Sequence, residues 1–298
     1  MRIEKLFQGK FSTLKQVIRL FLMGFTKGSL VTRASAVAYN LFLALIPSTI
    51  LLFTLIPFVP IANFQSELLS LIADFIPENV YQVFENTLVE VVTQKSSVLL
   101  LIMLIVTIVF SSNGIHALIS AFNTSQHSFE TRTWFTQRTV SVILVALIFS
   151  MLLLSVGLII FSKIGINRLV ELQIIQVALM YYLLLIGRWL ILIMLLFFIV
   201  SFLYYLAPAK KTGWRFFSWG SAVATFMIII SSLVFSFYVN NFAQYNRLYG
   251  SLGTLMVLLL WLYLIAFSLI VGFEINVSVN MIRNGQKAAR LNVDSEYE

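Results

Sequence analysis

Residues 97–121 read SVLLLIMLIVTIVFSSNGIHALISA, a stretch that contains no Lys, Arg, Asp or Glu. A helix that crosses a bilayer needs about 20 mostly apolar residues, because its backbone polar groups find no water there and must be satisfied within the helix. Six segments of the chain qualify as spans: 36–60, 97–121, 138–162, 175–207, 214–239 and 252–281. We therefore predict an all-α integral membrane protein, built as a bundle of six transmembrane helices.

The composition of the whole chain leads to the same fold class. Hydrophobic residues make up 60% of the 298 residues and charged residues 11%, whereas a soluble domain has roughly 45–50% apolar and about 25% charged residues. The chain has no cysteine, which excludes disulfides, thiolate catalysis and cysteine-bound metals. Two histidines make a His-based metal cluster a poor prospect as well. We therefore expect no metal site and no cofactor.

The basic residues indicate how the spans are oriented, because cytoplasmic loops carry an excess of Lys and Arg. Segment 1–35 is the most basic, and loops 122–138 and 207–215 and the end of the chain hold most of the remaining cations. The basic residues of the first segment are Arg2, Lys5, Lys10, Lys15, Arg19, Lys27 and Arg33. This pattern predicts cytoplasmic N- and C-termini. It also explains the net charge of +8, so we do not expect nucleic acid as a partner.

Three regions are expected around and within the membrane. Residues 1–35 form a basic N-terminal segment with an amphipathic helix, which either lies on the anionic inner leaflet or packs under the bundle. Residues 36–282 form the six-helix transmembrane domain, and 283–298 a cytoplasmic polar tail. Within the domain, the outer loop 62–95 carries two apolar stripes with acidic polar faces, which predicts an outer amphipathic helical hairpin.

Charged residues inside a span are costly, usually face the protein interior, and are candidates for function. Only Arg188, near the middle of the fourth span, and Glu274, toward the cytoplasmic end of the sixth, meet this description. Their opposite signs suggest an ion pair, formed directly or through water or a ligand. Their depths differ, however, so Glu274 has an alternative partner in Arg33 or in another cation of the inner surface. A pair that only orients helices is an equally good interpretation.

Uncharged polar groups in the first two spans are further candidates. Asn40 supplies a hydrogen-bonding group that we expect to be buried, and Pro47 removes a backbone hydrogen bond in mid-span, which predicts a helix kink. Asn113 and His116 are three residues apart in the second span and share a helix face. Histidine is the side chain that changes charge near neutral pH, which suggests a role with a proton or an anion here; a histidine satisfied by a neighbouring polar side chain is the more common arrangement.

The fifth span has small residues at a spacing that favours helix packing. Gly220 and Ala224, with Ser221 and Thr225 beside them, form a small-xxx-small pattern. Small residues let two membrane helices approach closely. We therefore expect this face of the fifth span to pack against another helix.

Five strings of residues lie in the first, second and last spans: RASAVAYNLFLALIP at 33–47, SNGIHALISAFN at 112–123, YGSLGT at 249–254, WLY at 261–263 and GFEIN at 272–276. Together they resemble the YihY/BrkB family of bacterial membrane proteins, and none of them is a catalytic motif. The resemblance covers nearly the whole chain. It implies a six-span, multi-pass protein of the bacterial cytoplasmic (inner) membrane.

Members of that family have been labelled as ribonuclease BN, as a serum-resistance virulence factor, and as transporters or lipid-handling proteins. A hydrolytic ribonuclease needs a metal site or a general acid–base pair facing the cytoplasm. The predicted inner loops offer only His127, Glu130 and the acids Asp294, Glu296 and Glu298, in unconnected places. These residues make a poor nuclease, and we expect this protein not to be an enzyme.

Transport or lipid handling of an anionic or amphipathic substrate fits the residues better. In this hypothesis Arg188 contacts the anionic group, Glu274 balances the charge, and Asn40, Asn113 and His116 line the route. The partners are then membrane lipids and a lipid or anionic small molecule, and oligomerisation stays open. The alternative is a membrane scaffold without transport, in which the acidic hairpin 62–95 or the N-terminal helix docks a partner protein.

Overall fold

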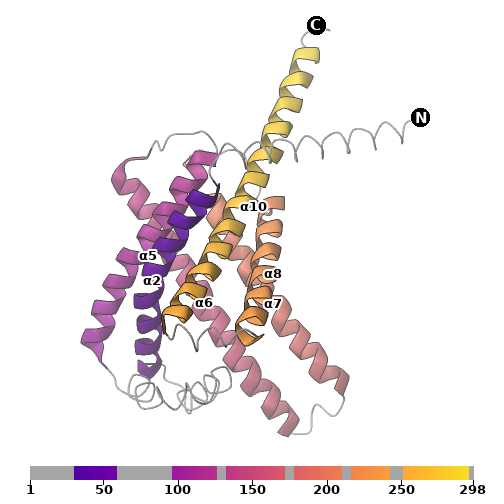
Figure 1. The fold of residues 1–298 in the computed structure, drawn as a ribbon. Helices are drawn as coiled ribbons and strands as arrows, with labels where there is room; N and C mark the ends of the chain where they lie inside the picture. The colour runs from indigo at the N-terminus through magenta and orange to yellow at the C-terminus, as the bar shows by residue number, and fades with distance from the viewer. Residues whose placement is uncertain are drawn as a thin grey trace. The chain divides into compact units, whose positions relative to one another are not determined.

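A computed structural model describes residues 30–58, 96–125, 132–171, 178–209, 216–241 and 251–294 of the chain. The described elements are six long α-helices and one short 3-10 turn, which confirms the predicted all-α class (Figure 1). They are α2 (Leu30–Leu55) with η1 (Ile56–Phe58), α5 (Ser97–Ser125), α6 (Trp134–Glu171), α7 (Ala178–Leu206), α8 (Trp219–Asn241) and α10 (Ser251–Asp294).

All six α-helices are long and apolar enough to cross a membrane. Many of their large apolar side chains are exposed in the isolated chain, among them Leu101 and Ile105 of α5 and Phe237 of α8. Such a surface is stable when acyl chains cover it, because the bilayer core is itself apolar. The protein is therefore a multi-pass membrane protein.

The helix ends differ from the predicted regions at both ends of the chain. The first described helix begins at Leu30, inside the predicted N-terminal segment 1–35, and α10 continues to Asp294 through most of the predicted tail 283–298. The predicted amphipathic helix before Leu30 and the outer hairpin 62–95 lie outside the described residues. Both therefore remain predictions.

The chain divides into two compact units. Unit 1 comprises Met1–Leu41, Gly114–Leu144 and Leu196–Glu298, and unit 2 comprises Phe42–Asn113 and Val145–Leu195. The described part of unit 1 includes the first half of α2, the second half of α5, and all of α8 and α10.

In unit 1, α8 and α10 pack closely against each other. A Cβ on Gly220 would collide with the carbonyl oxygen of Gly272, and a Cβ on Gly272 would lie 2.6 Å from the Cβ of Ala224. Farther along, the indole nitrogen of Trp261 donates to the hydroxyl of Ser232 at 3.2 Å. The helices run antiparallel, since residue numbers rise along one as they fall along the other. The predicted packing face of the fifth span is confirmed.

An aromatic cluster forms the centre of unit 1. Phe122 of α5 stacks on Phe273 of α10 with ring centroids 4.1 Å apart, and Tyr204 of α7 meets both rings edge-on. The hydroxyl of Tyr204 donates to the carbonyl oxygen of Leu269 at 2.6 Å. Phe122 and Phe273 are fully buried. This cluster fixes α10 next to α5 and α7, and so positions the residue that follows Phe273.

Candidate functional site

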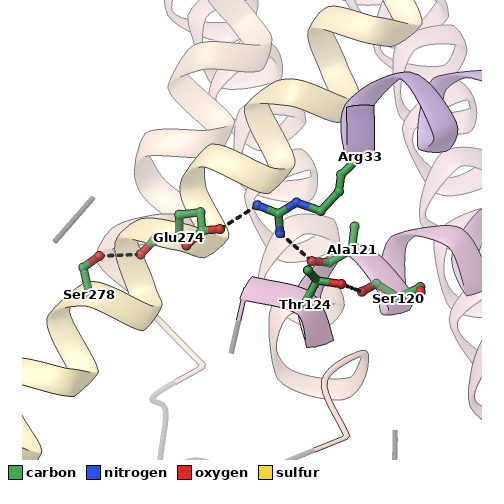
Figure 2. A network of polar contacts seen from close by, with 6 residues as sticks. All are labelled: Arg33, Ser120, Ala121, Thr124, Glu274 and Ser278. Atoms are coloured by element: carbon green, nitrogen blue, oxygen red, sulfur yellow. Dashed lines mark hydrogen bonds and ion pairs between the residues drawn. The ribbon is translucent and has the colours of Figure 1, made fainter. Parts of the chain in front are cut away.

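Glu274, the residue after Phe273, is buried in α10 and forms an ion pair with Arg33 of α2. One guanidinium nitrogen of Arg33, Nη2, lies 2.8 Å from the Oε1 atom of Glu274 (Figure 2). The two side chains are 9% and 7% exposed. In so dry a setting two opposite charges at this distance attract strongly. The sequence suggested Arg188 as the partner of Glu274 and left Arg33 open as the alternative, and the structure has Arg33.

Arg33 also joins a third helix to the ion pair. Its Nη1 atom donates to the carbonyl oxygen of Ala121 in α5 at 2.8 Å. Figure 2 shows the guanidinium between α10 on one side and α5 on the other. A planar guanidinium suits this task, because it presents several N–H donors in fixed directions. The network therefore ties the beginning of α2 to α5 and α10 and neutralises the carboxylate.

Other polar side chains of unit 1 bind backbone groups near helix ends. Asn276 of α10 accepts from the backbone N–H of Gly220 at 2.8 Å and donates to the hydroxyl of Ser218 at 2.8 Å. It thus satisfies groups at the start of α8, where backbone N–H groups have no partner within the helix. Arg132 donates to the carbonyl oxygens of Leu206, Ala207 and Pro208, after the end of α7.

Sequence reasoning missed these two residues as determinants of the site. Asn276 lies in the string GFEIN at 272–276, two residues after Glu274, so its place in the motif was a signal. In the sequence, Arg132 counts only as a cytoplasmic cation. A loop cation near the C-terminus of a helix interacts favourably with the last carbonyls, but which helix it reaches cannot be read from sequence spacing.

Arg188 lies in α7 and belongs to unit 2, whereas Glu274 belongs to unit 1. Its Nε atom is buried and has no hydrogen-bond partner among the described residues. The guanidinium carbon lies 5.7 Å from the ring centroid of the neighbouring Trp189. A Cβ on the adjacent Gly187 would meet no atom within 4 Å. Arg188 is therefore a cation within a span whose neighbour Gly187 has open space at its Cβ position.

The uncharged candidates are less enclosed than expected. Asn40 is only half-buried, and its amide donates to the carbonyl oxygen of Ala36 in its own helix at 2.9 Å. Asn113 and His116 are both exposed on α5. Pro47 is buried inside α2, which continues through it to Leu55. The expected kink at Pro47 and the roles of the polar residues along a route remain predictions.

The described residues contain no group of three or more His, Cys, Asp or Glu side chains that could hold a metal ion. The polar side chains described at the site are guanidinium, carboxylate and amide groups. Such groups bind and orient charged ligands and hold helices together.

Comparison with known proteins places the chain in a family. The sequence matches the family described as "Virulence factor BrkB" over residues 21–295. It is 30% identical to the ribonuclease-like protein YfkH of Bacillus subtilis over 82% of this chain and 88% of that protein. It is 29% identical to a UPF0761 membrane protein of Idiomarina loihiensis, over 30% of this chain and 32% of that protein. A UPF0761 membrane protein of Vibrio campbellii is 34% identical over 31% and 29%, respectively. No solved structure matches. This protein belongs to the BrkB family of membrane proteins.

Proposed function

We propose that this protein is not an enzyme, and that it moves or handles an anionic or amphipathic substrate in the bacterial cytoplasmic membrane, with both of its termini in the cytoplasm. The observation that carries the proposal is the environment of Arg188. A guanidinium within a spanning helix, with a buried Nε that has no hydrogen-bond partner among the described residues, is a binding group for an anion.

The energetics favour this role. An ionised side chain within a bilayer is costly, and such residues are found where they pair with another group or border a polar path. A buried donor without an acceptor adds a desolvation cost of about 1–3 kcal/mol. An anionic oxygen beside Arg188 would remove both penalties, because guanidinium groups form short, strong hydrogen bonds with phosphate and carboxylate.

The ion pair of unit 1 takes a different part in the proposal. The Oε1 atom of Glu274 already accepts from Arg33, so Glu274 serves first to hold α2, α5 and α10 in place. Arg188 then supplies the charge that recognises the substrate. This assignment replaces the simpler hypothesis in which Glu274 balances Arg188.

The name of the Bacillus subtilis relative raises ribonuclease activity as a second candidate, which we do not propose for this chain. Phosphodiester hydrolysis at neutral pH calls for a metal-activated water or a positioned acid–base pair. In the described residues, the one acidic side chain of the candidate site, Glu274, is buried and bonded to Arg33.

The proposal is tested in liposomes that contain phosphatidylglycerol carrying a fluorescent headgroup. A membrane-impermeant reductant bleaches only the outer leaflet of protein-free vesicles. Vesicles with the wild-type protein should lose the remaining fluorescence as well, with or without an imposed proton gradient. Arg188→Ala should abolish this extra loss, and Arg188→Lys should retain part of it because the positive charge is kept.

The matched control is Leu190→Ala, which shortens an exposed side chain of the same helix two residues away. This variant should exchange lipid at the wild-type rate. Exchange by the wild type and by Arg188→Ala at equal rates would show that Arg188 is not the binding group. No exchange by the wild type, together with recovery of a partner protein that depends on residues 62–95, would favour the scaffold instead.

A further inference from the structure

Two helical surfaces of unit 1, one on α8 and one on the second half of α5, differ in the chemistry of their exposed residues. On α8 the exposed residues from Phe226 to Val234 are all apolar and large. On the second half of α5 the exposed residues are all polar, and they are His116, Ser120 and Thr124. These three are spaced four residues apart, so they form one stripe along the helix. The α5 stripe lies within a segment that is long and apolar enough to span a membrane.

The first half of α2 continues this polar surface. Contacts of Arg33 with Ala121 and of Leu41 with Gly114 show that α2 and α5 run antiparallel here. The same register places the exposed Tyr39 level with His116, and the exposed Ser35 level with Ser120. Tyr39 is 59% exposed. Two neighbouring helices thus present polar side chains at matching levels.

Acyl chains are a poor covering for this surface. Polar groups that face hydrocarbon without partners cost free energy, which is why exposed faces of spanning helices are normally apolar. From Thr124, next to the end of α5, to His116 the stripe extends about 12 Å along the helix axis. It therefore reaches from near the predicted cytoplasmic surface well into the membrane.

The chemistry of the stripe indicates what covers it. Residues 30–41 and 114–124 contain no Asp or Glu, and their exposed polar groups are hydroxyls and an imidazole. The hydroxyls of Ser35 and Thr124 donate to carbonyl oxygens of their own helices, those of Val31 and Ser120. Hydroxyl and imidazole groups donate hydrogen bonds, so Tyr39, His116 and Ser120 are the donors that the stripe offers to a ligand. A surface with hydrogen-bond donors and no Asp or Glu among its own residues is complementary to a phosphate group.

We propose that the α2–α5 stripe, formed by Ser35 and Tyr39 with His116, Ser120 and Thr124, holds the phosphate-bearing headgroup of a membrane phospholipid while its acyl chains stay in the bilayer. This inference rests on the proposed function and narrows its substrate to a phospholipid. It also gives the headgroup a contact surface on the exterior of unit 1, in addition to the contact with Arg188.

The test uses the absence of native cysteine, which lets a single introduced cysteine carry a fluorescent label without background. Labels are placed at His116→Cys and at the matched control Ile230→Cys, on the exposed apolar face of α8. Both full-length variants are reconstituted in liposomes that contain phosphatidylcholine with a nitroxide quencher either on the headgroup or near the middle of an acyl chain.

The label at Ile230→Cys should be quenched more strongly by the acyl-chain nitroxide, as for any lipid-facing residue in mid-membrane. The label at His116→Cys should show the reverse ratio, with the headgroup nitroxide as the stronger quencher. In a third variant the label is placed at Ser120→Cys. Adding Tyr39→Phe and His116→Leu to this variant should strengthen quenching by the acyl-chain nitroxide relative to quenching by the headgroup nitroxide.

Two results would overturn the inference. Stronger quenching of His116→Cys by the acyl-chain nitroxide would show that hydrocarbon covers the stripe. Quenching by neither lipid, with disulfide-linked dimers of unlabelled Ser120→Cys, would show that a second copy of the chain covers it. The ratio of headgroup to acyl-chain quenching does not depend on lipid movement. It therefore tests where the headgroup lies even if the wild-type protein exchanges no lipid in the liposome assay.

Discussion

Arg33 with Glu274 and Arg188 are charged groups within spanning helices, but their surroundings differ. Arg33 and Glu274 are less than a tenth exposed and are bonded to each other at 2.8 Å. Arg188 forms no ion pair with any of the described residues, and its guanidinium lies against the ring of Trp189. The charge that the protein neutralises holds helices together, and the charge without a described counter-ion is the one that we propose for a ligand.

The largest effect should come from removing the carboxylate of the ion pair. Glu274→Ala leaves the charge of Arg33 in a dry site without its counter-ion, and breaking a buried pair in this way costs about 3–5 kcal/mol. Reversible unfolding in mixed micelles should show this loss. Exchanging the two residues, Arg33→Glu with Glu274→Arg, should recover part of it. If Glu274→Ala unfolds at the same midpoint as the wild type, the ion pair has no structural role.

A smaller effect is expected from the helix contact that supports the pair. In Gly272→Ala the new Cβ would lie 2.5 Å from the hydroxyl of Tyr204 and 2.6 Å from the Cβ of Ala224. Overpacking of this kind costs about 1–3 kcal/mol. Gly187→Ala is the matched control beside Arg188, where a Cβ meets nothing within 4 Å. It should be neutral or, through helix propensity, stabilising by up to about 1 kcal/mol. Equal losses in the two variants would contradict the contrast between a packed and an open site.

The smallest effect on stability, and one of opposite sign, is expected at Arg188. Arg188→Met keeps an unbranched apolar side chain and removes the charge and the buried donor, so the free energy of unfolding should stay the same or rise. The same micelle titration measures it. A destabilisation as large as that of Glu274→Ala would mean that Arg188 is an internal structural charge, and the comparison would then fail.

The fold was predictable because membrane insertion depends on simple properties of the sequence. Runs such as 97–121 are long, apolar and uncharged, and each predicted span corresponds to an observed helix. Helix ends were less predictable. Residues 283–294 are polar yet continue α10, because outside the bilayer a polar sequence extends a helix as readily as an apolar one.

The candidate site was predictable as a set of residues but not as a set of contacts. Charge within a span singled out Glu274 and Arg188. The partner of Glu274 depends on the register between α2 and α10, which lie more than 200 residues apart in the chain, and one sequence does not encode that register visibly. Exposure was also out of reach, because Asn40 is a polar residue in an apolar span, for which we expected burial, and it is only half-buried.

The most direct test of the central claim observes the Nε–H groups of both arginines in one spectrum. The protein is labelled with ¹⁵N-arginine in lipid nanodiscs, and the two signals are assigned by their loss in Arg188→Lys and in Arg33→Lys. Replacing phosphatidylcholine with phosphatidylglycerol should shift the Arg188 signal and leave that of Arg33 in place. A shift confined to Arg33, or no shift of Arg188 with the anionic lipid, would contradict the account.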